Sequence, residues 1–406
     1  MTELRATITT ILKKMNGLNK SRKDFLTHTL ILFLSIRSRI NFLQLARYSD
    51  TYVESSFRLH FEQFFDFADF NSLLAKDYGS GHFINAFDPS YIRKSGKHTP
   101  QVGKFWSGCS QRMEKGLEAG AFSVVDIDNH TAFHLDTIIS PNKEELTEKD
   151  ITLMEHYVNA VCWSAKYLEQ SSSYLAVDAF FAKKDFILPV LAKTNLHIIS
   201  RLRDDASLMY VYDGPRKVGR GAPQKYDGKV NIQKPDFSKF NLVFEDEKVR
   251  IHDIIVYCKF LKQKIRLAYT QWIAENGKTT VKLYFSTDLN LPAWMIVKYY
   301  HARFQEEFLF RDGKQFTGLN HCQARTTNKL EFHWNCSLTA INIAKVNFFL
   351  AVPKDQRKAF SMANVKTVCH NQLIIDRFFE ILPKNTELSK NHPKVKELYY
   401  YGCIAT

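Results

Sequence analysis

The segment 299–314 constrains this chain more than any other, because its spacing predicts one helix with four different functional groups on a single face. The four residues lie at offsets of 0, 3, 7 and 14, and they are Tyr300, Arg303, Glu307 and Lys314. At about 100° per residue, these positions fall within roughly 60° of one helical face. A phosphate-handling metal site needs this mixture, in which the carboxylate holds the cation while Arg and Lys contact phosphate oxygens.

A solvated helix with an i,i+4 pair between Arg303 and Glu307 would explain the same spacing. However, Y-x2-R-x3-E-x6-K is the signature of a large group of bacterial insertion-sequence transposases, and the sequence resembles that family at all four positions. Its members are cut-and-paste enzymes of the DDE type with an RNase H-like catalytic core. The resemblance implies two aspartates upstream of the signature that complete a metal site.

The composition agrees with a nucleic-acid-binding protein. The chain has 406 residues, which suggests two or three domains, and a formal net charge of +14, which favours polyanionic partners. RNA-binding proteins remain compatible with the charge alone. No apolar run of 18 residues and no secretory signal peptide is found in the sequence, so we expect no membrane association and a cytoplasmic location, close to the bacterial nucleoid.

The order of helical and strand patterns predicts an α/β fold: an RNase H-like core with a β-rich insertion, preceded by a helical domain. The N-terminal helical segment is expected to bind DNA, because the family commonly recognises its terminal repeats there; a packing or dimerisation domain is the alternative. The expected domains are a helical DNA-binding domain at 1–78, the first part of the core at 79–203, the insertion at 204–288, the second part of the core at 289–350 and a C-terminal helical region at 351–406.

The first catalytic aspartate has several candidates in the sequence. A strand predicted from His82 to Phe87 should end at Asp88, because the following Pro89 lacks an N–H group. Asp126 and Asp128 are alternatives, but they lie in or beside a predicted hairpin turn, away from the expected site. The stretch FDPSYIRKSGKHTPQVGKFWSG resembles the first-aspartate motif of the family, and this resemblance favours Asp88.

The second and third catalytic acids are chosen by the predicted strand or helix on which each candidate lies. Asp178 ends an apolar strand predicted over 174–177, whereas its competitors Asp185, Asp204 and Asp205 lie near a helix start or beyond the next strand. The third acid is expected to be Glu307. Its neighbour Glu306 points about 100° away from the face that carries the other signature residues.

The resemblance implies that Asp88, Asp178 and Glu307 are the catalytic residues and hold two Mg²⁺ ions, with Mn²⁺ as a substitute. It also implies that Tyr300, Arg303 and Lys314 clamp phosphates near the cleaved end. Further DNA contacts are expected from basic residues in two other segments, namely Lys94, Lys97, Arg216, Lys217 and Arg220.

The function implied is that of a DNA transposase, which cuts at the ends of its insertion sequence and joins the 3' ends to target DNA. A homodimer is expected in the synaptic complex, because two ends must be cut together. Two alternatives remain open from the sequence: a DNA-binding protein without catalysis, such as a domesticated relative, and a nuclease of the same fold that cleaves but does not join.

Overall fold

The computed structural model describes residues 1–215, 223–381 and 392–403 of the chain. The expected α/β class is confirmed, with helices at the N-terminus and a large mixed sheet. The chain forms two compact units, and strand β1 (Phe83–Arg93) contributes to both. Unit 1 comprises Met1–His82, Pro89–Asp150 and Gln305–Thr406, and unit 2 comprises Phe83–Asp88 and Ile151–Phe304.

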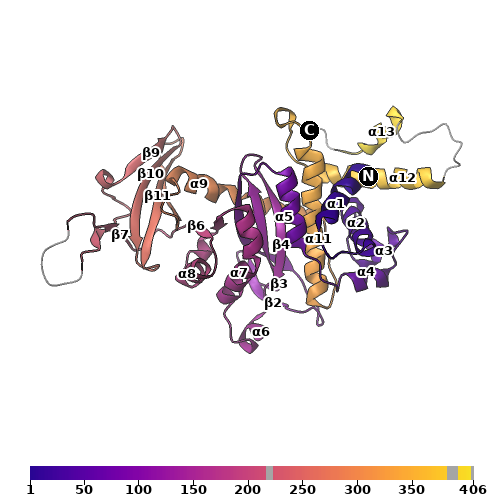
Figure 1. Cartoon of the computed structure of the whole chain (residues 1–406), viewed down its shortest axis with the longest axis horizontal. Helices are drawn as coiled ribbons and strands as arrows, with labels where there is room; N and C mark the ends of the chain where they lie inside the picture. The colour runs from indigo at the N-terminus through magenta and orange to yellow at the C-terminus, as the bar shows by residue number, and fades with distance from the viewer. Residues whose placement is uncertain (216–222, 382–391, 404–406) are drawn as a thin grey trace. The chain divides into compact units, whose positions relative to one another are not determined.

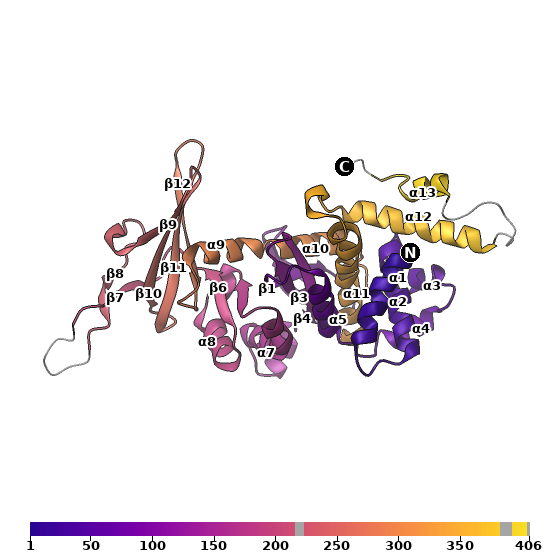
Figure 2. The same ribbon diagram turned by 45° about the horizontal axis from the view of Figure 1, so that its top comes forward.

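Unit 1 begins with five helices: α1 (Thr2–Lys14), α2 (Lys20–Ser35), α3 (Phe42–Arg47), α4 (Glu54–His60) and α5 (Phe67–Tyr78). Asn19 starts α2, because its side chain accepts a hydrogen bond from the Arg22 backbone N–H at 2.8 Å. All of the apolar side chains of α2 are buried. They pack against the long helix α11 (Thr327–Lys345), which lies beside α2 in both views (Figures 1 and 2).

Helix α11 also packs on β4, which belongs to the antiparallel strands of unit 1 (Figure 2). These strands are β2 (Gly103–Ser107), β3 (Arg112–Asp126) and β4 (Thr131–Ile139). The hairpin predicted at this place is confirmed, since Val125 pairs with Ala132 across a tight turn. Helices α5, α10 (Gln305–Gln315) and α11 all contact β4, so its side chains are mostly buried.

Strand β1 is longer than the sequence indicated, and the prediction that Pro89 ends it is wrong. The strand continues to Arg93. Its parallel partner β5 (Tyr174–Val177) stops where Val177 lies opposite Phe87. Beyond this point one side of β1 has no β5 partner, and a residue without an N–H group is tolerated where a ladder hydrogen bond is missing.

Unit 2 contains the parallel part of the sheet. The sequence predicts strands over 174–177 and 197–201, and β5 and β6 (His197–Arg201) lie there. The order is β1–β5–β6 with parallel pairing. Parallel neighbours require crossover connections. Helix α7 (Leu153–Ser171) precedes β5, and helix α8 (Lys184–Lys193) connects β5 to β6 (Figure 1).

An antiparallel set of strands extends this sheet beyond β6. They are β7 (Leu208–Val211), β8 (Tyr226–Lys229), β9 (Asn241–Glu245), β10 (Val249–Cys258), β11 (Gln263–Ile273) and β12 (Thr279–Ser286). Strand β12 pairs with β6, and the order continues through β11, β10, β7 and β8, while β9 pairs with β10. The strand-rich segment therefore adds to the edge of the parallel strands. Helix α9 (Ala293–Ala302) packs on β10–β12.

The single helix predicted over 299–314 is wrong, because this segment forms two helices. Helix α9 ends at Ala302 and α10 begins at Gln305. Between them the backbone N–H of Phe304 bonds the His301 carbonyl at 3.1 Å, which is a tighter i→i−3 turn. Because the segment is not one continuous helix, helical spacing alone does not place all four signature residues on one face.

Helix α10 runs without interruption through Gly313 to Gln315. A Cβ atom on Gly313 would lie 2.9 Å from the Leu338 side chain, so glycine here permits close packing of α10 on α11. The chain continues through α12 (Met362–Ile381) and α13 (Pro393–Tyr399). Among the described helices, none combines the length and the apolar composition that a membrane crossing would require.

Two carboxyl groups lie where β4 meets α11, namely Asp136 and Glu331. Burial, followed by the negative charge of Glu331, raises the pKa of Asp136 to about 7. Burial also raises the pKa of Glu331 to about 7. The backbone N–H of Ile139 donates to Glu331 Oε1 at 3.0 Å, so this carboxyl group connects α11 to β4.

Replacing Asp136 with Asn should change how stability depends on pH. In the wild type, the raised pKa contributes stability that is present below the unfolded pKa and is lost as the pH rises through about 7. Asp136→Asn removes this loss, so its free energy of unfolding should rise relative to wild type between about pH 4 and 7, by on the order of 1 kcal/mol per pH unit. Urea denaturation across this range measures the difference.

The exposed Asp355 provides a matched control, since Asp355→Asn makes the same chemical change at the surface of unit 1. The buried His134, whose pKa burial lowers to about 4, has the opposite dependence but is present in both proteins and cancels in the comparison. Parallel pH profiles for wild type and Asp136→Asn would mean that Asp136 is ionised in the folded protein.

Candidate active site

Asp88 and Asp178 occupy neighbouring positions in unit 2. The parallel pairing of β1 with β5 places Phe87 opposite Val177, and each aspartate is the next residue along its chain. Neighbouring strands lie about 5 Å apart. The fold therefore brings together two carboxylates that are far apart in the sequence.

Asp178 is held at the carboxyl end of β5 by local contacts. Its side chain accepts a hydrogen bond from the Ala179 backbone N–H at 2.6 Å and starts the short helix η1 (Ala179–Phe181). The Ser200 hydroxyl donates to the Asp178 carbonyl at 3.1 Å, which ties this turn to β6. Asp178 is half-buried.

The aspartates that were alternatives to Asp178 are more exposed to solvent. Asp185 is exposed in the first turn of α8, and Asp204 and Asp205 are exposed after β6. None of them follows the central strand β5. Their positions agree with ordinary surface or capping acids.

Tyr300 and Arg303 extend from the end of α9 to the two aspartates. The Tyr300 hydroxyl lies 3.5 Å from Asp178 Oδ1, and Arg303 Nη1 lies 3.8 Å from Asp88 Oδ2. The Arg303 guanidinium is also 5.6 Å from the centre of the Tyr300 ring. Half of the signature is therefore assembled around the two aspartates in unit 2.

The electrostatics keep Tyr300 a neutral donor. Burial raises the pKa of the Tyr300 phenol, the nearby Arg303 opposes this rise, and Asp178 adds to it. The Arg303 side chain is only 11% exposed. A phenol and a guanidinium held in this way can both donate hydrogen bonds to phosphate oxygens.

The rest of the signature belongs to unit 1. Glu307 is exposed in the first turn of α10, while its neighbour Glu306 is 0% exposed. The Lys314 ammonium donates to the Ser90 hydroxyl at 2.7 Å, so it lies against the extended part of β1. The structure describes the two units individually, so the convergence of Glu307 with the two aspartates stays a prediction.

Of the five basic residues outside the signature that were predicted to contact DNA, the structure describes two. Lys94 follows β1, and its ammonium donates to the Cys322 carbonyl. Lys97 lies in the same loop, and both lysines line one pocket of unit 1. Three further predicted contacts lie outside the described residues, and they are Arg216, Lys217 and Arg220.

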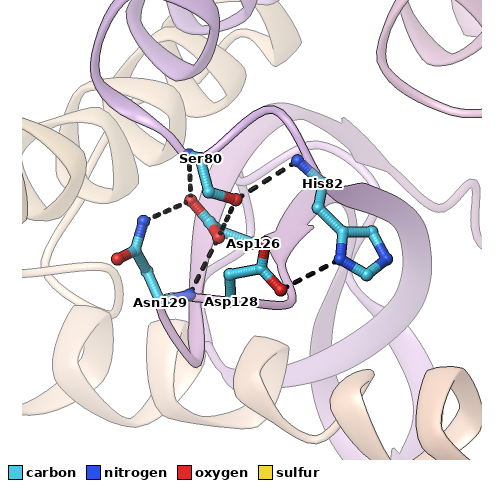
Figure 3. A network of polar contacts seen from close by, with 5 residues as sticks. All are labelled: Ser80, His82, Asp126, Asp128 and Asn129. Carbon is cyan, nitrogen blue, oxygen red and sulfur yellow. Dashed lines mark hydrogen bonds and ion pairs between the residues drawn. The ribbon is translucent and has the colours of Figure 1, made fainter.

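Asp126, the alternative to Asp88, has a structural role. Its buried carboxylate accepts hydrogen bonds from the backbone N–H and hydroxyl of Ser80 and from the backbone and side-chain N–H groups of Asn129. Figure 3 shows this network, in which Asp128 pairs with His82 at 3.0 Å. Because the Asp126 carboxylate is already saturated, it is a poor candidate for a metal ligand.

The donor chemistry of the site fits a hard divalent cation, since Asp88 and Asp178 offer carboxylate oxygens at adjacent positions. Within the part of the chain that the structure describes, no group of three or more His, Cys, Asp or Glu side chains could hold a metal ion. Glu307 as a third ligand therefore stays a prediction from the sequence signature.

Sequence reasoning did not single out two residues that lie beside these groups. Ser90 contacts Lys314, and Arg201 is close enough to Tyr300 to lower its pKa. Ser90 is two residues beyond Asp88, but its role depends on the continuation of β1 past Pro89. No local pattern indicates Arg201, which the pairing of β6 brings to this place.

A mixed α/β fold with two carboxylates on adjacent parallel strands, a phenol and a guanidinium beside them, is typical of metal-dependent enzymes that act on phosphodiesters. Comparison with protein families agrees with this class: the family described as "Transposase DDE domain" matches residues 127–343, more than half of the chain. The chain belongs to this family, which implies an RNase H-like core and suggests a DNA-cutting transposase activity. A search of curated proteins found no match.

The matched range contains Asp178 and all four signature residues, but it begins after Asp88. The assignment of Asp88 therefore depends on its pairing next to Asp178 and on its contact with Arg303. Family membership supports a DNA-binding protein, and it suggests a divalent metal cofactor for the enzyme.

Proposed function

We propose that this protein is an insertion-sequence transposase of the group with the Y-x2-R-x3-E-x6-K signature. It would cut DNA at the ends of its element and join the 3' ends to target DNA. The observation that carries this proposal is the placement of Asp88 and Asp178 side by side on parallel strands, in a chain of the transposase DDE family.

In this proposal Asp88, Asp178 and Glu307 hold two Mg²⁺ ions, for which Mn²⁺ can substitute. When bound, such ions neutralise charge at the phosphorus and activate the attacking oxygen. The carboxylates supply the negative charge that retains the cations. Arg303, 3.8 Å from Asp88, offsets part of that charge and can hold a phosphate oxygen against the site.

Both proposed reactions exchange one P–O bond for another. In cleavage, the oxygen of water bonds to phosphorus, the bond from phosphorus to the 3' oxygen breaks, and the products are a 3' hydroxyl and a 5' phosphate. In joining, that 3' hydroxyl attacks a target phosphodiester and displaces a target 3' hydroxyl. Tyr300, Arg303 and Lys314 orient the phosphate in both steps by donating hydrogen bonds to its oxygens.

The remaining assignments follow from the same proposal. Residues 1–78 would recognise the terminal inverted repeats, 79–203 and 289–350 would form the catalytic core, and 204–288 would form its insertion. Residues 351–406 would be a C-terminal helical region. Lys94, Lys97, Arg216, Lys217 and Arg220 would contact the DNA backbone, and two protomers would hold the two ends in the bacterial cytoplasm.

A strand-joining assay tests the proposal. The purified protein is incubated with Mg²⁺, a supercoiled target plasmid and a labelled duplex that carries the inverted repeats flanking the gene. Transposition predicts labelled 3' ends covalently joined to the plasmid. Cleavage without joining would indicate a nuclease of the same fold, and binding without cleavage would indicate a non-catalytic DNA-binding protein.

A further inference from the structure

A pocket of about 590 Å³ in unit 1 gathers positive charge from separate stretches of the chain. Its lysine and arginine side chains are Arg39, Arg93, Lys94, Lys97, Lys115 and Arg325. No acidic side chain of the described residues lines it. We call it the basic pocket.

Part of the charge of the basic pocket has no ion-pair partner among the described residues. Among the described residues, no ion pair involves Arg39, Lys97 or Arg325, and all three side chains are exposed. Lys94 is half-buried, and its ammonium donates to the Cys322 carbonyl rather than to a carboxylate. Burial lowers the pKa of Lys94, and the charge of Arg39 lowers it further. An anion in the pocket would relieve this repulsion.

The residues that line the basic pocket also indicate which part of an anionic ligand the pocket binds. A protein that binds nucleotides through their bases uses aromatic side chains as stacking surfaces. The basic pocket contains no Phe, Tyr or Trp among its described lining residues. Its chemistry therefore favours phosphate groups over bases.

The position of the basic pocket relates it to the signature. Lys314 contacts Ser90 on β1, and Lys94 follows the end of the same strand. Four residues of extended chain span about 13 Å. Along the axis of duplex DNA, where each strand carries one phosphate per about 3.4 Å, that length corresponds to about four nucleotides of one strand. One DNA backbone could therefore meet Lys314 and the pocket in succession.

We propose that the basic pocket binds the sugar–phosphate backbone of duplex DNA, a few nucleotides from the phosphate that Lys314 contacts. This rests on the proposed function, in which Lys314 contacts a phosphate next to the cleaved bond. Binding is independent of base sequence and of metal ions, because cations that contact phosphates position the duplex without reading it.

The double variant Arg39→Ala/Arg325→Ala tests the proposal. Each phosphate contact releases counterions, so log affinity falls with log salt by about 0.9 per phosphate neutralised. With a fluorescently labelled mixed-sequence duplex and no divalent metal, the slope between about 50 and 200 mM salt should flatten by up to about 2 units. Lys143→Ala/Lys149→Ala is the control, since it removes two exposed charges from a helix rich in glutamate. Its slope should match wild type.

Lysine acetylation of the wild-type protein gives a second readout that needs no variant. DNA should protect Lys97 and Lys115, while Lys143 stays reactive. Inorganic phosphate at the same phosphate concentration should protect them less. Equal protection by phosphate would assign the pocket to a free anion and overturn the proposal.

An unchanged salt slope in the Arg39→Ala/Arg325→Ala variant, with Lys97 and Lys115 unprotected, would also overturn it. If wild type still cuts and joins DNA in that case, only the pocket assignment fails. If wild type binds no DNA at all, the proposed function fails as well.

Discussion

Asp178→Asn should lower the rate of DNA strand cleavage by at least about 100-fold, while the protein folds and binds DNA as the wild type does. The amide keeps the shape of the side chain and the hydrogen bond from Ala179, but it removes the negative charge that would retain a divalent cation. A metal that stabilises transition-state charge contributes several kcal/mol, and each factor of ten in rate corresponds to about 1.4 kcal/mol. A nicking assay and a gel-shift assay on the same duplex measure the two properties.

Binding should be unchanged or slightly tighter in this variant, because one negative charge near the phosphate is removed. Asp185→Asn is the matched control, since Asp185 is exposed at the start of α8, a few residues further along the chain. It should cleave at the wild-type rate. Ordinary cleavage by Asp178→Asn at the usual Mg²⁺ concentration would exclude Asp178 as a metal ligand.

Glu307→Gln should reduce cleavage by a similar factor of at least about 100 without lowering the melting temperature. Glu307 is exposed on α10, so replacing its carboxylate by an amide disturbs little packing. The loss would come from the third proposed metal ligand. Cleavage rates and thermal unfolding are measured on the same protein preparations.

The neighbouring Glu306 makes this test discriminating. Because its side chain is 0% exposed, Glu306→Gln should act on stability and leave the cleavage rate of the folded protein within a few-fold of wild type. Glu144→Gln, at an exposed position on α6 (Lys143–Glu148), should change neither property. If Glu306→Gln abolished cleavage at an unchanged melting temperature while Glu307→Gln did not, the third ligand would be Glu306.

The two glutamates also show what helical spacing can predict from the sequence. The sequence predicted that Glu306 points about 100° away from the face that carries Glu307, and in α10 Glu306 is buried while Glu307 is exposed. The break between α9 and α10 does not affect the angle between Glu306 and Glu307, because both residues lie in α10. Tyr300 and Arg303 lie on the other side, so their relation to Glu307 did not follow from the same geometry.

The sequence by itself determined the family resemblance, the α/β class and the position of Asp178 after an apolar strand. These depend on local patterns: residue spacing along a helix, and a short apolar run that reports a buried strand. Strands β5 and β6 were located for this reason. The hairpin of β3 and β4 was located in the same way, from alternating segments around a short turn.

Only the tertiary structure decided the features that depend on partners far away in the sequence. Strand β1 tolerates Pro89 because β5 ends before it, and Asp126 is a structural residue because Ser80 and Asn129 saturate its carboxylate. The basic pocket combines residues from Arg39 to Arg325, so no window of sequence contains its charge. The physical reason is the same each time: strand pairing, hydrogen bonding and charge act between neighbours in space, and folding chooses those neighbours.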